Sequence, residues 1–290
     1  MTLAPSELIL NEDGSIYHLH LLPHQLADTV ITVGDPDRVE QVTKHFDSIE
    51  FSVQKREFKT TTGAYQNKRI TVISTGIGTD NIDIVLNELD ALANIDFKTR
   101  TLKKDLKKLN IIRLGTSGSI QKDIPVDRIL LSERALGFDA LLHFYQSDTI
   151  RDKAFEQAFI NHTSWNVEKS TPYCVSASKT LFDHFDSEEF FSGATATNIG
   201  FYGPQGRQLR LKTEDTQLND KLESFDFKGT RITNLEMETS GIYGLCKLLG
   251  HRALSINAIL ANRATGVFSK DPAATVNHMI TTALASIASL

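Results

Sequence analysis

The sequence predicts an α/β protein organised as a single domain. Apolar runs rich in β-branched residues alternate along the chain with segments of helical periodicity, which is typical of helices packed on a central sheet. The chain has 290 residues, of which 40% are hydrophobic, so it can bury a large core without disulfide support. No internal repeat or low-complexity linker divides residues 1–290, so we expect one domain.

The first predicted strand covers residues 29–33 and ends in the turn Gly34-Asp35-Pro36, after which a helical stretch runs from Val39. The further predicted strands cover residues 50–53, 58–65, 69–74, 111–114, 129–135, 165–176, 231–234 and 252–260, and the further predicted helices residues 81–92, 237–249 and 272–289. In sheets of this kind ligands bind beyond the carboxyl ends of the strands. Most of the unusual motifs of this chain follow such ends.

Composition argues against a polyanionic partner and against a membrane protein. The formal net charge of -5 at pH 7 disfavours DNA or RNA, although a few convergent arginines can make one cleft positive. Cys174 and Cys246 lie far apart without metal-ligand spacing, which favours free thiols in a reducing compartment. Residues 1–14 lack the pattern of a secretory leader, and no segment has the apolar length of a membrane span. We therefore expect a soluble cytoplasmic protein.

Residues 94–110 form a basic insertion in this pattern. Its cations are Lys98, Arg100, Lys103, Lys104, Lys107 and Lys108. A run of this kind is most often a solvated helix or loop, and a partner-binding patch is the alternative interpretation. It gives no reason to expect nucleic acid.

Several motifs of well-known sites are incomplete here. The glycines of Thr75-Gly76-Ile77-Gly78 lack the third glycine of a dinucleotide-binding turn, because Asn81 stands in its place. The sequence contains neither a P-loop nor the GxSxG turn of an α/β-hydrolase. His18 and His20 could lie on one face of a strand, but no acidic or cysteine cluster accompanies them. We therefore expect no metal site.

Three arginines near predicted strand ends indicate an anion site. Arg38 follows the turn at Gly34, Arg113 precedes the loop that holds Thr116, and Arg56 stands in a strand and loop segment. The planar guanidinium group pairs bidentately with phosphate oxygens, and backbone N–H groups near Gly34 and Thr116 could complete a cradle. Each arginine taken alone fits a surface ion pair better. Their joint placement at strand ends favours phosphate.

An ordered set of motifs, which covers most of the chain, resembles those of one enzyme family. The set runs through Tyr17-His18-Leu19, Gly34-Asp35-Pro36-Asp37-Arg38-Val39, Arg56-Glu57-Phe58, Ser74-Thr75-Gly76-Ile77-Gly78, Arg113-Leu114-Gly115-Thr116-Ser117-Gly118, Phe201-Tyr202-Gly203-Pro204-Gln205-Gly206-Arg207, Asn234-Leu235-Glu236-Met237-Glu238 and Asn262-Arg263. By these motifs the chain resembles the nucleoside phosphorylases of the hexameric purine and uridine type, and their uridine-preferring members most closely. The resemblance implies a central mixed, partly barrel-like sheet flanked by helices.

The resemblance also implies roles for particular residues. Phosphate would be bound by Gly34, Arg38, Arg56, Arg113 and Thr116, with Arg56 reaching in from a neighbouring subunit. Ribose would be bound by His18, Thr116, Met237 and Glu238, with His18 also contributed across the subunit boundary. The base would be bound by Phe201, Gln205, Arg207 and Glu236. The catalytic residues would be Arg38, Arg113, Thr116, Glu238 and Arg263. The protein would be a homo-oligomer whose smallest competent unit is a dimer.

Some of these residues also have purely structural interpretations. Glu236 and Glu238 open a predicted helix, where carboxylates commonly stabilise the helix dipole. Met237 could fill the core, and the Phe201 ring could simply pack. The resemblance is what favours the functional interpretation.

The implied reaction is phosphorolysis of a nucleoside, with inorganic phosphate as co-substrate and no further cofactor. It passes through a ribose with oxocarbenium-like charge, so catalysis is mainly positioning and electrostatic stabilisation. In the purine members an aspartate after the late strand protonates the base, whereas this chain has Asn262-Arg263. Together with Gln205 and Arg207, this favours a pyrimidine and therefore conversion of uridine to uracil and ribose 1-phosphate.

Three other functions remain as alternatives: a purine nucleoside phosphorylase, a nucleosidase that uses water, and a non-catalytic nucleoside binder. A nucleosidase would have little use for Arg38, Arg56 and Arg113 together. The sequence leaves open whether thymidine or 2'-deoxyuridine is accepted.

Overall fold

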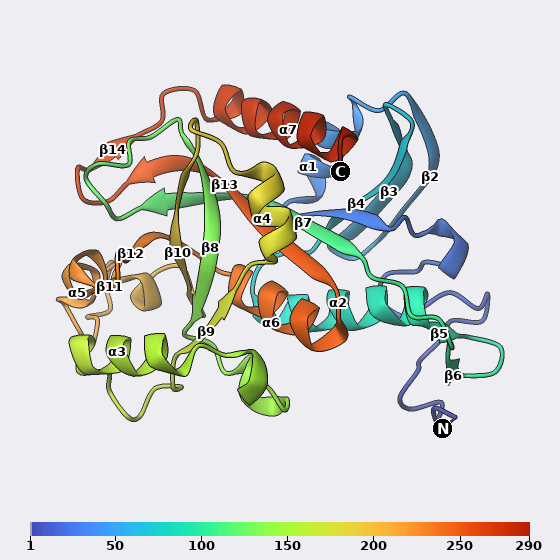
Figure 1. Cartoon of the computed structure of the whole chain (residues 1–290), viewed down its shortest axis with the longest axis horizontal. Helices are drawn as coiled ribbons and strands as arrows, with labels where there is room; N and C mark the ends of the chain where they lie inside the picture. Colours follow the sequence, from blue (N-terminus) through green and yellow to red (C-terminus); the bar gives the residue numbers. More distant parts are fainter. Residues whose placement is uncertain (1) are drawn as a thin grey trace.

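The computed structural model describes residues 2–290 and contains one large mixed sheet (Figure 1). The strands of this sheet are β1 (Thr29–Val33), β2 (Ser48–Lys55), β3 (Phe58–Tyr65), β4 (Lys68–Ser74), β7 (Asn110–Ser119), β8 (Ile129–Gly137), β9 (Tyr173–Ser176), β10 (Phe191–Thr197), β11 (Asp226–Phe227), β12 (Thr230–Glu236), β13 (Arg252–Asn262) and β14 (Val267–Phe268). A second, small sheet pairs β5 (Ile95–Asp96) with β6 (Thr101–Leu102). The α-helices are α1 (Pro36–Thr43), α2 (Thr79–Asn94), α3 (Lys153–Thr163), α4 (Lys179–Phe185), α5 (Leu218–Ser224), α6 (Thr239–Leu249) and α7 (Pro272–Ala288).

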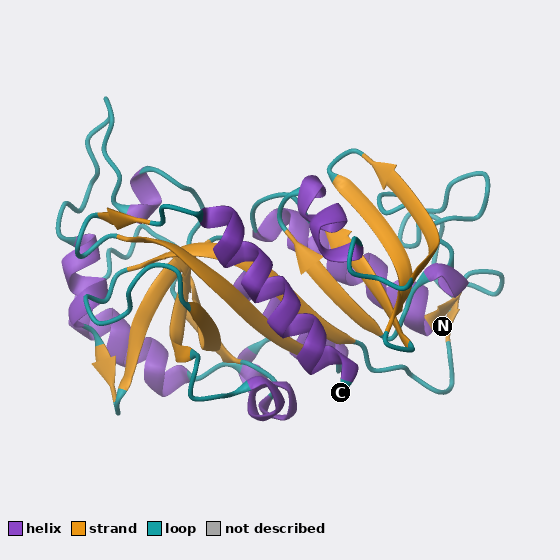
Figure 2. Cartoon of the chain, turned by 90° about the horizontal axis from the view of Figure 1, so that it is seen from above, coloured by secondary structure: helices purple, strands orange, loops and turns teal. Residues whose placement is uncertain are grey.

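Five strands of the large sheet close into a barrel. Neighbours pair in the order β12, β10, β8, β13 and β7, and an antiparallel pairing of β12 with β7 closes the ring. From β7 the sheet continues through β1, β4, β3 and β2 as an open arm, which lies to one side of the barrel in Figure 2. The predicted α/β fold with a mixed, partly barrel-like sheet is confirmed.

Helices cover the long central strands on opposite sides. On one side α6 packs on β13 and β8 and also against α2, while on the other side α7 crosses β13 and β7 (Figure 1). Ile31, Ile112 and Leu254, from β1, β7 and β13, are fully buried between these layers. Strands covered on both faces are expected to be apolar along their whole length. This pattern predicted β1 at its observed bounds and β13 to within two residues, whereas it predicted only residues 111–114 of β7.

Residues 165–176 differ from the prediction, because only their last part, β9, is a strand. The Trp165 ring instead packs 4.8 Å from the Phe138 ring and 5.6 Å from the Phe159 ring, measured between centroids. Its Nε1 donates to the carbonyl of Ser170 at 3.0 Å, which holds the segment in a turn. Trp165 therefore serves a local aromatic cluster, while Val167 is exposed to solvent.

The sequence pattern did not predict β10, although this strand belongs to the barrel. Its residues are mostly small, and Gly193, Ala194 and Ala196 give no bulky apolar signal. A Cβ at Gly193 would lie 2.4 Å from Cγ2 of Thr233 on the neighbouring β12. Close packing inside the barrel thus requires small residues in β10. Because small residues give no apolar signal, the sequence pattern did not indicate this strand. The short helices α3, α4 and α5 were also not predicted.

The basic insertion at 94–110 forms the hairpin of β5 and β6 followed by an irregular segment, so it is a loop rather than a helix. Three of its cations hold the fold together. Arg100 donates to backbone carbonyls near the N-terminus, and Lys103 donates to the carbonyl oxygens at the end of α2. Lys107 pairs with Asp28 at 3.1 Å. These contacts give three of the six cations a structural role, while Lys98, Lys104 and Lys108 are exposed, and the partner-binding interpretation stays a prediction.

The histidines singled out above are separate and do not lie in a strand. His18 Nδ1 lies 2.6 Å from a carboxylate oxygen of Glu88, and His20 Nε2 lies 2.9 Å from one of Asp13. Among residues 2–290 no group of three or more His, Cys, Asp or Glu side chains is arranged to hold a metal ion.

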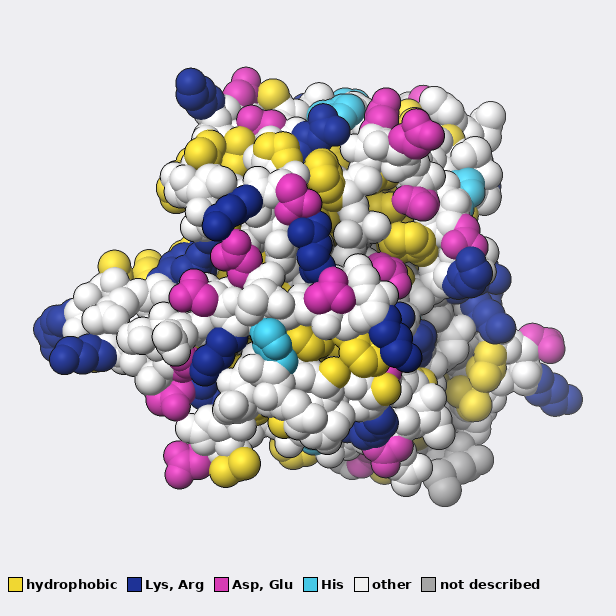
Figure 3. Space-filling model, turned by 60° about the vertical axis from the view of Figure 1, so that its left-hand side comes forward, with side chains coloured by type: hydrophobic (Ala, Val, Ile, Leu, Met, Phe, Trp, Pro, Cys, Tyr) yellow, Lys and Arg dark blue, Asp and Glu magenta, His cyan; other side chains and the backbone are white. Residues whose placement is uncertain are grey.

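No helix among the described residues is long and apolar enough to cross a membrane. On the face of the barrel side that Figure 3 presents, acidic and basic side chains are interspersed. That face therefore offers no single-sign field to a polyanion.

Candidate active site

Several chain segments converge on one cavity of about 780 Å³. They are the loops after β1 and β4, the first turn of α1, β7 from Arg113 onward, the link between β12 and α6, the end of β13 and the loop after β10. Ten predicted site residues line this cavity: Gly34, Arg38, Arg113, Thr116, Phe201, Gln205, Arg207, Glu236, Met237 and Glu238. The site thus lies where strand ends of an α/β sheet usually bind ligands.

Three predicted site residues do not line the cavity of this single chain. His18 is engaged by Glu88, away from the cavity. Arg56 stands in the turn between β2 and β3, with a positive φ of 55°. Arg263 lies behind the cavity wall, where its Nη1 donates to the backbone carbonyl of Gln205.

Arg38 presents a cation to the cavity. It stands in the first turn of α1, where the N-cap Asp35 accepts a hydrogen bond from the backbone N–H of Asp37 at 2.9 Å. Its Nε is buried and has no hydrogen-bond partner among the described residues. Burial lowers the pKa of Arg38, and the positive charge of nearby Arg113 lowers it further. Two neighbouring guanidinium groups, one of them incompletely paired, form a site for an anion.

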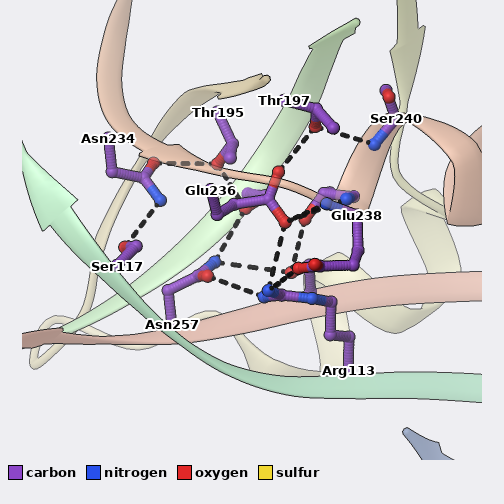
Figure 4. Close-up of polar contacts among 12 residues, drawn as sticks. Arg113, Ser117, Thr195, Thr197, Asn234, Glu236, Glu238, Ser240 and Asn257 are labelled. Atoms are coloured by element: carbon purple, nitrogen blue, oxygen red, sulfur yellow. Dashed lines mark hydrogen bonds and ion pairs between the residues drawn. The ribbon is translucent and has the colours of Figure 1, made fainter. Parts of the chain in front are cut away.

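Arg113 on β7 is fully enclosed by polar partners (Figure 4). Its Nη2 lies 2.6 Å from Glu238 Oε2 and 3.1 Å from Glu236 Oε2. Its Nη1 donates to Asn257 Oδ1 at 2.9 Å. Burial alone lowers the pKa of Arg113, but the two carboxylates outweigh it and the net change is upward. The guanidinium folds over Gly115, where an added Cβ would lie 1.8 Å from Nη1.

Glu236 at the end of β12 fixes the start of α6. Its Oε2 accepts hydrogen bonds from the backbone N–H groups of Glu238 and Thr239, both at 2.9 Å. Its Oε1 accepts one from the Thr197 hydroxyl at 2.6 Å (Figure 4). A carboxylate in this position stabilises the helix N-terminus. Both oxygens of Glu236 are therefore engaged by the protein itself.

Glu238 is buried at the N-cap position of α6, and its carboxylate reaches the cavity. Besides the contact with Arg113, its Oε1 accepts a hydrogen bond from the backbone N–H of Gly78 at 2.9 Å. Burial raises the pKa of Glu238, while the charge of Arg113 acts in the opposite direction. Each carboxylate oxygen can accept more than one hydrogen bond, so Glu238 retains capacity for hydroxyl donors of a ligand.

The loop after β10 forms another part of the cavity wall. The Arg207 guanidinium stacks on the Phe201 ring, 3.8 Å from its centroid, and Nη1 donates to Gln205 Oε1 at 2.6 Å. Gln205 is buried, with Arg263 behind it. Burial and the charge of Arg207 lower the pKa of Arg263 to about 10. This wall combines an aromatic face with amide and guanidinium donors, which suits a flat polar ring.

Sequence reasoning missed Ser117 and Phe268 in the cavity wall and Asn257 behind it. Strand alternation could have revealed Ser117, because it shares a face of β7 with Arg113. Phe268 on β14 is 74% exposed in the single chain, and no local pattern marks it. Asn257 lies in an apolar run that predicted only a buried strand.

Paired guanidinium groups, a buried glutamate and a wall suited to a flat ring give the barrel opening the character of an enzyme active site. The chain belongs to the phosphorylase superfamily, whose family model matches residues 28–289.

Individual relatives are similar over most of their length. A uridine phosphorylase of Thermococcus kodakarensis is 29% identical over 265 residues, which cover 89% of this chain and 82% of the relative. A DeoD-type purine nucleoside phosphorylase of Shewanella loihica is 26% identical over 270 residues, covering 91% of this chain and 94% of the relative. The crystal structure of a Trypanosoma brucei nucleoside phosphorylase that shows uridine phosphorylase activity has a TM-score of 0.87 and 29% identity. It covers 98% of this chain and 100% of the other.

Proposed function

We propose that this enzyme cleaves uridine with inorganic phosphate to give uracil and ribose 1-phosphate. The observation that carries the proposal is a single cavity bounded by Arg38, Arg113 and Glu238, with Gln205 and Arg207 in its wall. The uridine phosphorylases among the relatives support it. The reaction needs phosphate as co-substrate and no further cofactor.

The phosphate ion binds between Arg38 and Arg113, with Gly34 and Thr116 as further contacts. The unpartnered Nε of Arg38 supplies a donor for one of its oxygens. Because Arg113 is held by two carboxylates, its position is fixed before the substrate arrives. Such preorganised charge needs little reorganisation during the reaction.

Ribose binds beside Glu238, whose carboxylate accepts hydrogen bonds from the 2'- and 3'-hydroxyls, while Met237 packs against the sugar. Holding the sugar in this way aligns the anomeric carbon with a phosphate oxygen. The C–O bond to phosphate forms as the C–N bond to the base breaks, and the base leaves with the electron pair of that bond. No protein nucleophile takes part.

The base binds against Phe201, and Gln205 and Arg207 contact its edge. Arg263 supports this wall through the Gln205 backbone and helps to stabilise negative charge on the leaving uracil. A guanidinium is a poor general acid, so the position after β13 suits a pyrimidine anion better than a purine that needs a proton. This favours uridine over the purine alternative.

The decisive experiment is a substrate panel with purified protein. With uridine we expect uracil release that requires phosphate and yields an equal amount of ribose 1-phosphate. We expect kcat/KM for uridine to exceed that for inosine or adenosine by about 100-fold or more, because buried polar groups of the base site stay unpaired with the wrong ring. Faster purine cleavage would establish the purine alternative, phosphate-independent cleavage a nucleosidase, and binding without turnover a non-catalytic protein.

The functional unit is proposed to be a homo-oligomer, in which His18 and Arg56 complete the site of a neighbouring subunit. Neither residue lines the cavity of its own chain, which supports this arrangement. The expected role in the cell is pyrimidine nucleoside salvage in the cytoplasm. The two buried, unpaired cysteines are compatible with a reducing compartment.

Subunit complementation tests the shared site. Arg56→Ala should inactivate the neighbouring site and Glu238→Gln the site of its own chain, so each variant alone should be nearly inactive. In a mixed dimer, one site has both residues intact. After subunit exchange the mixture should therefore recover about a quarter of wild-type activity. Recovery of no activity by a mixture that forms mixed oligomers, shown by native mass spectrometry, would contradict a shared site.

A further inference from the structure

Inside the barrel, buried polar side chains connect Arg113 to Ser117 through a continuous series of hydrogen bonds (Figure 4). Arg113 Nη1 bonds to Asn257 Oδ1 at 2.9 Å, and Asn257 Nδ2 to Ser132 Oγ at 3.0 Å. Ser132 Oγ lies 2.5 Å from Thr195 Oγ1. Two further bonds, Thr195 Oγ1 to Asn234 Oδ1 at 2.8 Å and Asn234 Nδ2 to Ser117 Oγ at 2.9 Å, complete the series. The four residues between Arg113 and Ser117 are fully buried.

The direction of these bonds follows from the chemistry of the groups. A guanidinium can only donate, so Arg113 fixes the Asn257 amide with its oxygen towards Arg113 and its nitrogen towards Ser132. The Ser132 oxygen therefore accepts, and its own proton finds an acceptor only in Thr195 among the described contacts. A buried hydroxyl proton without an acceptor would keep its full desolvation penalty, so this orientation is favoured.

The direction of the remaining hydrogen bonds, from Thr195 to Ser117, follows in the same way. Because Thr195 accepts from Ser132, its proton goes to Asn234 Oδ1, which turns the Asn234 nitrogen towards Ser117. The Ser117 oxygen then accepts from Asn234. Its proton is left to point away from Asn234, and Ser117 lines the cavity.

We propose that this one-directional series makes Ser117 a fixed hydrogen-bond donor to the base, with Asn257, Ser132 and Thr195 as positioning residues that set the direction. The inference rests on the proposed function. Strand β7 carries Ser117 four residues, or about 13 Å, beyond Arg113. It lies next to Gly118, where an added Cβ would lie 3.8 Å from Cγ of Arg263. The acceptor is therefore a carbonyl oxygen of the pyrimidine, on which negative charge grows as the base leaves.

Thionucleosides test the proposal, because sulfur accepts hydrogen bonds more weakly than a carbonyl oxygen. We would measure kcat/KM for uridine, 2-thiouridine and 4-thiouridine at saturating phosphate, and take the ratio of uridine to each analogue. In Ser117→Ala the ratio at one of the two positions should fall by about tenfold, which is the value of one hydrogen bond to a charged group. The ratio cancels differences in the amount of folded enzyme.

Two Thr→Val substitutions then separate the directional series from general packing. Thr195→Val breaks the series without touching the cavity and should lower the same ratio. Thr163→Val is the matched control, since this buried hydroxyl donates to the Phe159 carbonyl at 2.8 Å and contacts no member of the series. The control should leave the ratio unchanged. If Thr195→Val does not fold, Ser132→Ala breaks the neighbouring link.

The outcomes distinguish the two proposals. Unchanged ratios at both positions in Ser117→Ala would overturn the donor assignment. A change in Ser117→Ala without one in Thr195→Val or Ser132→Ala, or an equal change in Thr163→Val, would overturn the directional series. Absence of phosphate-dependent uracil release by the wild-type enzyme would instead contradict the proposed function itself.

Discussion

Replacing Gly115 by alanine is expected to lower kcat/KM for phosphorolysis by about 1000-fold. The new Cβ would stand 1.8 Å from Nη1 of Arg113, so the guanidinium has to leave its present position. Displacement removes a preorganised charge from the phosphate site, and loss of one such group typically costs about 100- to 1000-fold. Displacement also leaves the carboxylates of Glu236 and Glu238 without their shared cation, so the free energy of unfolding should fall as well.

Steady-state kinetics with varied phosphate, together with thermal unfolding, measure both effects. The matched control is Gly203→Ala, because an added Cβ there meets no atom within 4 Å and the residue does not line the cavity. The control should retain activity and melting temperature. A Gly115→Ala enzyme with normal kinetics would show that the position of Arg113 over this glycine is unimportant for catalysis.

Replacing Arg38 by methionine is expected to reduce phosphorolysis by about 1000-fold for a different reason. Its guanidinium has an unpartnered Nε and a lowered pKa, so the protein gives it little compensation for its burial. A buried charge with few protein partners lowers the free energy of unfolding, but it remains free to pair with a bound anion. Arg38→Met should therefore lose phosphate binding while its melting temperature stays equal or rises.

Phosphate titration during thermal unfolding provides the measurement. In the wild type, phosphate at 100 times its dissociation constant should add about 2.7 kcal/mol to the free energy of unfolding. Arg38→Met should show almost none of this protection. Arg252→Met removes an exposed arginine at the start of β13 and should behave like the wild type. Full phosphate protection of Arg38→Met would place the anion elsewhere.

The sequence predicted the fold well where burial or strand propensity acts on every residue of an element. β1 and β3 have the predicted bounds. β1 is largely buried and consists of β-branched residues, and β3 contains three consecutive threonines, whose β-branched side chains also favour strands. β10 escaped prediction because contact with β12 requires small residues there. Closure of the barrel by pairing of β12 with β7 joins segments more than 100 residues apart, which no local pattern encodes.

The candidate site was predictable where a motif carried it and not where tertiary contacts define it. The placement of arginines at strand ends pointed to Arg38 and Arg113, and the family motifs added Glu238; the structure brings all three to one cavity. By contrast, the engagement of Glu236 Oε1 depends on Thr197 from another strand. Only the folded arrangement reveals that contact, and the same is true of Asn257 behind Arg113.

β7 belongs to the barrel and also pairs with the first strand of the open arm. This position limits how the substrate specificity of the enzyme can evolve. One continuous strand carries both Arg113 and Ser117. The distance between the phosphate site and the base site is therefore fixed by a strand segment of roughly 13 Å. Insertions in that spacer would shift the register of β7 against both β12 and β13. Adaptation to larger or smaller bases must therefore come from the loop at 198–207, which can vary in length and shape without disturbing the sheet.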